Sequence, residues 1–164
     1  MVKETATAYG RGLPISTKQG VEICNFIRGR TVAESKKLLE GVIAGRTAVP
    51  FKRFNKDMGH RKGKIASGRF PKKASEHILN LIKSVESNAK SLGLNASLII
   101  EELIANKGSR NWHYGRIRRI KNKRTHVKIT VKEGKVEKKT QEKPKKKPEV
   151  KKEKPKEKKN EEKK

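Results

Sequence analysis

Apolar residues recur every three or four positions in three stretches of the chain, residues 16–29, 31–45 and 71–93. This spacing is typical of amphipathic helices whose apolar stripe faces a core. The longest stretch begins at Pro71, a residue that suits the first turn of a helix. We therefore predict three helices, of which the first two form a helical hairpin with a tight turn between them.

The two shorter helices each begin with a residue pair that is typical of a capping box. Gln19 follows Ser16, and Glu34 follows Thr31, three positions along the chain in both cases. In a capping box each side chain satisfies a free backbone N–H group at the helix start. We predict this arrangement for both helices.

Three segments have the pattern of strands. Apolar and polar residues alternate over residues 125–132, residues 98–105 are β-prone, and residues 5–15 predict an edge strand. Glu101 and Glu102 are adjacent in the second of these segments, so we expect their side chains to point to opposite faces. Helices and antiparallel strands together predict an α+β fold.

The segment between the last two strands is basic and contains three rings, Trp112, His113 and Tyr114. A hairpin arm of about residues 98–132 would project its tip by roughly 30 Å, at about 3.3 Å per residue. Such an arm has too few apolar residues to fold alone and needs a partner surface. Mixed rings and cations suit RNA, because guanidinium groups bind phosphates and rings stack on unpaired bases. The alternative is a solvated charged hairpin with Trp112 packed on its own strands.

Residues 46–70 lack a clear period and form a second basic segment. A loop of this length in a compact domain is usually functional or disordered. Phe51 and Phe54 stand among its cations, either as hydrophobic plugs that close the core or as part of a binding surface. The density of cations favours contacts with phosphates.

The charge of the whole chain points in the same direction. Its 164 residues include 44 Lys and Arg against 17 Asp and Glu, so the formal net charge is +27. Such an excess destabilises the compact state unless a polyanion neutralises it, and nucleic acid is the expected partner. Hydrophobic residues make up 32% and aromatic residues 4%, which excludes a deep pocket lined with rings. We expect no cofactor and no small-molecule substrate.

The last part of the chain differs in composition from the rest. Residues 134–164 contain 15 Lys, 7 Glu and only two hydrophobic residues, Val136 and Val150. This segment cannot bury enough apolar surface to offset the entropy of ordering. We predict a disordered basic tail after a folding unit of residues 1–133.

Catalytic, metal and membrane chemistry have no support in the sequence. Cys24 is the only cysteine and lies among apolar residues, so we expect it to pack as a small hydrophobe in a reducing compartment. The four histidines show no ligand spacing, and no phosphate-binding glycine loop or nucleophilic serine turn is present. No apolar run approaches the ~18 residues of a membrane span, and the first residues lack the apolar region of a signal peptide. We expect neither an enzyme nor a metal site.

Four blocks of residues, in this order, resemble a known family. They are Val49-Pro50-Phe51-Lys52-Arg53-Phe54-Asn55, Gly68-Arg69-Phe70-Pro71-Lys72-Lys73-Ala74, Glu86-Ser87-Asn88-Ala89 and Gly115-Arg116-Ile117. They resemble the family of ribosomal large-subunit protein twenty-two, in the archaeal and eukaryotic form that carries a basic insertion before the third helix. The resemblance covers about residues 8–133.

The resemblance implies a fold and a place in the cell. The expected fold is α+β, with a small antiparallel sheet, three helices, a long extended β-hairpin arm and the basic tail. Members are structural constituents of the large ribosomal subunit in the cytoplasm, bind its rRNA beside neighbouring ribosomal proteins, and assist assembly. The globular part lies near the polypeptide exit, and the hairpin lines the exit tunnel along the nascent polypeptide. The tip residues carried over to this sequence are Ser109, Arg110, Asn111, Trp112, His113 and Tyr114.

The predicted rRNA-binding residues are the cations and rings of the two basic segments and of the helix and strand ends. They are Arg11, Lys18, Arg28, Arg30, Lys52, Arg53, Lys56, Arg61, Lys62, Lys64, Arg69, Lys72, Lys73, Lys107, Arg110, Trp112, His113, Tyr114, Arg116, Arg118, Arg119, Lys121, Lys123 and Arg124. A non-ribosomal RNA chaperone or nucleoid-type protein would use the same basic surface without a fixed site. A membrane-surface protein is a third class, which the tail disfavours because it lacks apolar anchors.

Overall fold

The computed structural model describes residues 5–94, 97–117 and 119–134. Arg118 and residues 135–164, to which the predicted tail belongs, lie outside the described residues. The elements in chain order are β1 (Thr5–Leu13), α1 (Thr17–Ile27), α2 (Val32–Ile43), β2 (Val49–Pro50), β3 (Gly68–Arg69), α3 (Lys72–Ser91), β4 (Leu98–Lys107), the 3-10 turn η1 (Gly115–Ile117) and β5 (Thr125–Glu133). The three predicted helices and three predicted strands are all present.

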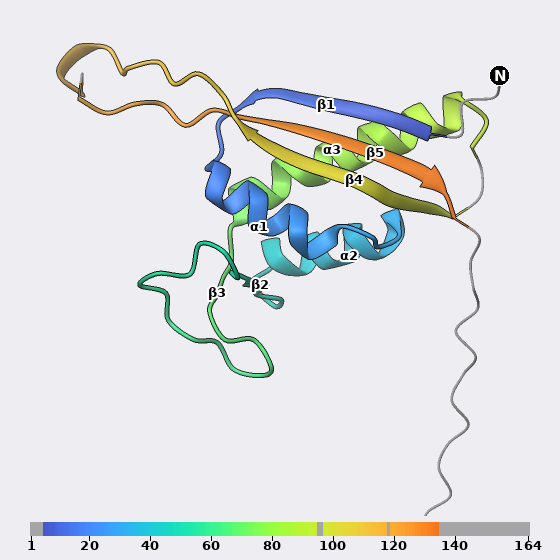
Figure 1. Cartoon of the computed structure of the whole chain (residues 1–164), viewed down its shortest axis with the longest axis horizontal. Coiled ribbons are helices and arrows are strands. Elements are labelled where there is room, and N and C mark those ends of the chain that lie inside the picture. Colours follow the sequence, from blue (N-terminus) through green and yellow to red (C-terminus); the bar gives the residue numbers. More distant parts are fainter. Residues whose placement is uncertain (1–4, 95–96, 118, 135–164) are drawn as a thin grey trace, which may run out of the picture.

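A three-stranded antiparallel sheet in the order β1-β5-β4 carries the helices on one face (Figure 1). Helix α3 packs on β1, α1 packs on β4, and α2 packs against α3. Val127, Ile129 and Val131 on β5 are buried on this face, as their alternation predicts. None of the described helices packs on the opposite face of the sheet, here called the open face.

The core lies between the sheet and the helices. Its largest fully buried side chains include Ile23, Leu39, Ile78 and Ile129, which come from all three helices and the central strand. Cys24 is buried beside them, and burial raises the pKa of its thiol to about 12. The thiol is therefore neutral and packs as the predicted hydrophobe.

The two predicted helix starts differ. At α2 the Thr31 side chain accepts a hydrogen bond from the Glu34 backbone N–H at 3.2 Å, which confirms the cap. At α1 the Ser16 side chain makes no cap hydrogen bond, so the predicted capping box is wrong there. The start of α1 is fastened to β5 instead, because the Thr17 and Thr125 hydroxyls lie 2.9 Å apart and Thr125 donates to the Ile15 carbonyl.

The predicted orientation of Glu101 and Glu102 is also wrong. The register of β4 against β5 shifts between Ile100 and Glu102, which makes a β-bulge. The extra residue places both carboxylates on the open face, where Glu101 accepts from Lys132 at 2.7 Å and Glu102 from Lys128 at 2.8 Å. Periodicity alone could not reveal this, because a bulge resets the alternation.

The long hairpin begins as regular ladder and ends as irregular backbone. Strands β4 and β5 pair from Leu98 and Glu133 to Lys107 and Thr125. Residues 109–124, here called the distal arm, project beyond the body of the protein (Figure 1). They contain one isolated bridge, Trp112 to Lys121, and the turn η1, where the prediction had continued the hairpin.

Candidate nucleic-acid interface

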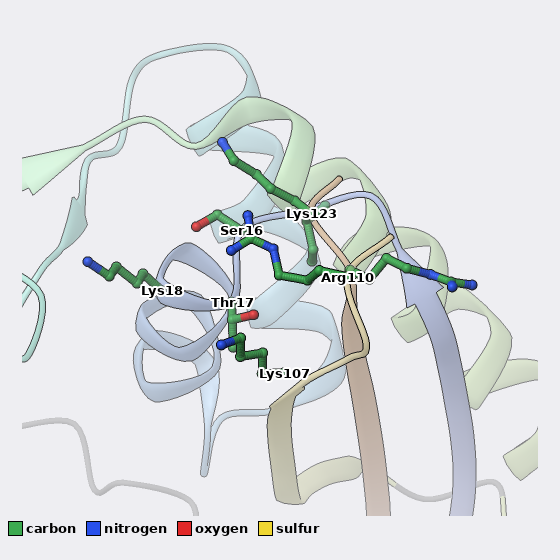
Figure 2. Close-up of a pocket in the computed structure, with 8 residues that line it drawn as sticks. Ser16, Thr17, Lys18, Lys107, Arg110 and Lys123 are labelled. Atoms are coloured by element: carbon green, nitrogen blue, oxygen red, sulfur yellow. The ribbon is translucent and has the colours of Figure 1, made fainter. Parts of the chain in front are cut away.

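Five cations from three segments of the chain surround a hollow of about 350 Å³ at the base of the distal arm. They are Lys18 on α1, Lys107 at the end of β4, and Arg110, Lys123 and Arg124 on the distal arm. Figure 2 shows the side chains that line this hollow, with Ser16 and Thr17 at the start of α1 among them. We call this site the arm-base hollow.

The fold brings these cations together by fastening the start of α1 to the root of the hairpin. The bonds from Thr125 to Thr17 and to Ile15 hold the helix start against β5. Gly20 lies against the hairpin root, where an added Cβ would be in ordinary van der Waals contact with the Ala105 side chain at 3.5 Å. The free N–H groups of the uncapped first turn of α1 add partial positive charge beside the hollow. The arrangement suits a phosphate group.

The distal arm is held by a few bonds of its own. The His113 N–H donates to the Ile120 carbonyl at 2.9 Å, and the Asn122 N–H donates to the Asn111 carbonyl at 2.8 Å. The Arg110 guanidinium donates across the arm to the Asn122 carbonyl at 3.1 Å. Of the arm's described side chains none is buried, so packing contributes little to its shape.

The rings of the distal arm face solvent. Tyr114 is 93% exposed and Trp112 is 57% exposed, while His113 is half-buried. The Lys121 ammonium lies 4.1 Å from the centroid of the Trp112 ring. The Trp112 ring is therefore partly covered by Lys121 of its own hairpin and otherwise open to solvent. Exposed rings beside cations can stack on unpaired bases while the cations bind the flanking phosphates.

The basic loop is organised by a buried carboxylate. Glu22 on α1 is 1% exposed, and its oxygens accept from the backbone N–H groups of Lys52 at 3.2 Å and of Arg53 and Phe54 at 2.8 Å. Phe51 is buried in the core, which confirms the plug interpretation for this ring. The anchored turn presents the Lys52 and Arg53 side chains outward.

Phe54 connects the loop to the arm-base hollow. Its ring is partly buried against the core and has two cations near it, Lys18 at 5.7 Å and Arg53 at 5.4 Å from the ring centroid. Lys18 also lines the hollow. The loop and the hollow therefore form one continuous basic surface across the start of α1.

The remaining cations of the loop divide into two groups. Arg61 is exposed, but its guanidinium bonds to the loop itself, donating to the Gly68 carbonyl at 3.1 Å and lying 5.2 Å from the centroid of the Phe70 ring. Strands β2 and β3 close the loop beneath it. The other predicted residues of this region are exposed: Lys56, Lys62, Lys64, Arg69, Lys72 and Lys73. Lys73 also lines a second hollow against the distal arm.

Three predicted residues lie away from this surface. Arg28 and Arg30 follow the other end of α1, where they donate to the Leu103 and Phe26 carbonyls. Arg11 lies on β1 and is exposed on the open face of the sheet. Of the predicted arm residues, Arg116, Arg119 and Lys121 are exposed.

Sequence reasoning missed the residues that position the interface. Glu22 was not among the predicted site residues, and its role depends on the loop whose backbone N–H groups its carboxylate accepts from. Thr125 was predicted merely as the first residue of a strand. Neither residue has a local signal, because both act through partners distant in the sequence.

Metal clusters and membrane-spanning helices were sought in the described part of the chain. Within residues 5–94, 97–117 and 119–134, no three His, Cys, Asp or Glu side chains gather where they could hold a metal ion. None of the described helices is long and apolar enough to cross a bilayer.

Comparison with known proteins identifies the family. The family model described as "Ribosomal protein L22p/L17e" matches residues 8–132. Proteins named "Large ribosomal subunit protein uL22" are similar over much of the chain. The protein from Nanoarchaeum equitans is 40% identical over 142 residues, which is 82% of each chain. The proteins from Archaeoglobus fulgidus and Methanococcus maripaludis are 43% identical over 108 residues and 47% identical over 109 residues; these matches cover 64% and 65% of this chain and 70% and 71% of the relatives. The matched residues run from β1 through the distal arm to β5. This chain therefore belongs to the ribosomal protein L22p/L17e family, in its archaeal type.

Proposed function

We propose that this protein is a structural, non-enzymatic component of the large ribosomal subunit and binds large-subunit rRNA. The observation that carries the proposal is the basic surface from the loop across α1 to the distal arm, which ends in the exposed rings of Trp112 and Tyr114. Family membership supports the same conclusion. Phosphate neutralisation supplies the affinity, and stacking on Trp112 and Tyr114 supplies contacts that salt does not screen.

The distal arm has the shape of an element that inserts into RNA. It projects away from the core, contains no described buried side chain, and has exposed apolar surface on Trp112, Tyr114 and Ile120. We propose that rRNA holds it and that its tip, residues 109–114, lines the exit tunnel and faces the nascent polypeptide. The globular part then lies near the tunnel exit beside neighbouring ribosomal proteins, and it assists assembly of the subunit in the cytoplasm.

Sedimentation of the tagged protein from a cell lysate tests membership of the subunit. We expect stoichiometric migration with the large subunit on sucrose gradients at low salt and again after a high-salt wash. Contacts buried between protein and RNA persist when screened phosphate attraction is lost. Release by the wash, or spreading over all RNA-containing fractions, would contradict the proposal and support an RNA chaperone.

A deletion tests the tunnel role separately. Subunits that carry the protein without residues 108–118 should still contain it, because the loop and the remaining cations of the arm-base hollow are retained. Translation stalling by a nascent chain should change, because the tip no longer reaches the tunnel. Unchanged stalling and unchanged translation would show that the tip does not line the tunnel.

A further inference from the structure

A further hollow, distinct from the arm-base hollow and from the one that Lys73 lines, lies on the open face of the sheet. It has a volume of about 280 Å³ and is lined by side chains of all three strands, among them Tyr9, Arg11, Ile104, Asn106 and Lys128. This volume is just below the range of about 300–1,000 Å³ that drug-sized ligands occupy. It suits a single planar group.

Two of its residues are exposed apolar side chains in one row across the sheet. Tyr9 on β1 and Ile104 on β4 both pair with Lys128 on the central strand. Tyr9 is 59% exposed and Ile104 is 36% exposed, whereas Ile100, Leu103 and Ile129 on the helix-covered face of the same sheet are buried. The row presents a ring and an aliphatic side chain on either side of a shallow floor. A flat aromatic ligand would cover both.

The charges around the hollow favour an anion beside that ligand. The Lys128 ammonium is held by Glu102 at 2.8 Å, and this pair lowers the pKa of the Glu102 carboxyl and raises the pKa of Lys128. The other open-face carboxylate, Glu101, is neutralised by Lys132. Arg11 has no carboxylate partner within the described residues. A positive group thus remains unneutralised at the edge of the hollow.

This hollow and the arm-base hollow both take lining residues from the root of the hairpin, His126 in the first and Arg124 in the second. The His126 ring accepts from the Gly12 N–H at 3.1 Å and lies so close to Gly108 that a Cβ there would stand 2.8 Å from it. The Arg124 guanidinium, which lines the arm-base hollow, reaches Gly12 beside Arg11. One strand of nucleic acid can therefore follow the basic surface around the hairpin root.

We propose that the open face of the sheet binds one unpaired nucleotide of single-stranded RNA, with its base stacked on Tyr9 against Ile104 and its phosphate on Arg11. Asn106 supplies an amide for hydrogen bonds to the edge of the base. The inference rests on the proposed function insofar as RNA is the partner, and it adds a site outside the two basic segments. A protein partner fits less well, because two isolated apolar side chains separated by an ion pair offer little contiguous apolar area.

Fluorine NMR of the intact chain with 3-fluorotyrosine tests the site directly. The sequence has two tyrosines, Tyr9 and Tyr114, so two signals arise, and the Tyr9→Phe variant assigns them. The probe is a short oligoadenylate, and a polyphosphate of equal charge controls for electrostatic binding. We expect oligoadenylate to shift the Tyr9 signal in a saturable way and polyphosphate to leave it in place, because only a base stacks.

Two variants on the same face sharpen the result. Ile104→Ala should raise the midpoint of the Tyr9 titration about threefold to fivefold, because it removes one wall of the hollow. Thr7→Ala is the matched control, since Thr7 is also exposed on β1 but does not line the hollow, and its midpoint should stay within about twofold of the original.

The outcomes separate this inference from the proposed function. A shift of the Tyr114 signal with a static Tyr9 signal would overturn the sheet site and leave RNA binding by the distal arm intact. Failure of both signals to move, with no RNA bound, would overturn both proposals. Equal shifts of the Tyr9 signal with polyphosphate would contradict the nucleotide site and indicate electrostatic binding. A Tyr9 shift that appears only when ribosomal proteins are added would contradict it too and indicate a protein contact.

Discussion

The two basic segments of this protein are built in opposite ways. The loop after α2 is tied to the core by three backbone bonds to Glu22, by the buried Phe51 and by the β2–β3 pair. The distal arm has no described buried side chain and only a few backbone bonds of its own. The protein therefore fixes where the loop cations lie, whereas the arm depends on its partner for order.

This difference teaches how a small core can serve a large RNA surface. Anchoring of the loop requires burial of the Glu22 carboxylate. Its desolvation is tolerated because the carboxylate oxygens are hydrogen-bonded. The arm adds no described buried side chain to the fold, and in the function proposed above RNA binding offsets the entropy of ordering it. Substitutions in the two segments should therefore have opposite effects on stability and on binding.

The largest expected effect comes from removing the distal arm. Replacement of residues 110–122 by an Asn-Gly turn should leave the free energy of unfolding within about 0.5 kcal/mol of the original, because no described buried side chain is lost. Affinity for large-subunit rRNA should fall about 1,000-fold, because several cations and both rings are removed. Urea denaturation and filter binding measure the two quantities. A large loss of stability would show that the arm belongs to the folding unit.

Glu22→Ala, in contrast to removal of the arm, should mainly reduce the stability of the protein. It leaves three backbone N–H groups without their acceptor, and the free energy of unfolding should fall by about 2–4 kcal/mol. Limited proteolysis should then cleave the loop between Phe51 and Ser67. Glu40→Ala on the exposed side of α2 is the matched control and should change stability by less than about 0.5 kcal/mol. Equal effects of the two variants would refute the anchoring role of Glu22.

Single rings of the distal arm should matter for binding alone. Trp112→Ala and Tyr114→Ala should each weaken RNA binding by about 5- to 150-fold, which corresponds to about 1–3 kcal/mol per stacked base. Trp112→Phe should retain most of the affinity because it keeps an aromatic face. Melting temperatures of all three variants should match that of the original protein. Binding that is unaffected by both alanine variants would exclude stacking.

The smallest effect concerns an ion pair outside both segments. The Lys36 ammonium, hydrogen-bonded to Glu86, holds the pKa of that carboxyl below its ordinary value of 4.5. A lowered pKa in the folded state stabilises the protein above about pH 4.5, and this contribution is lost as the pH falls through the lowered pKa. Glu86→Gln should therefore reduce stability by about 0.5 kcal/mol at pH 7 and by nothing in strong acid. Equal destabilisation at both pH values would contradict this linkage.

The sequence predicted the features that depend on the local spacing of apolar residues, and it missed those that depend on residues far away in the chain. The helices and strands follow from apolar spacing, and the exposed rings of the arm follow from its lack of apolar neighbours. The bulge at Glu101 and the burial of Glu22 depend on β5 and on the loop, respectively, and neither leaves a local signal. The meeting of Lys18 with Arg110 depends on the packing of α1 against the hairpin root.

The central claim is that RNA, and not the protein, orders the distal arm. Amide hydrogen exchange of the free protein and of the same protein within purified large subunits tests it most directly. In the free protein the His113 and Asn122 amides should exchange fast while those of β5 remain protected, and in the subunit all of them should be protected. Equal protection of the arm in both states, or an arm that remains unprotected in the subunit, would contradict the account.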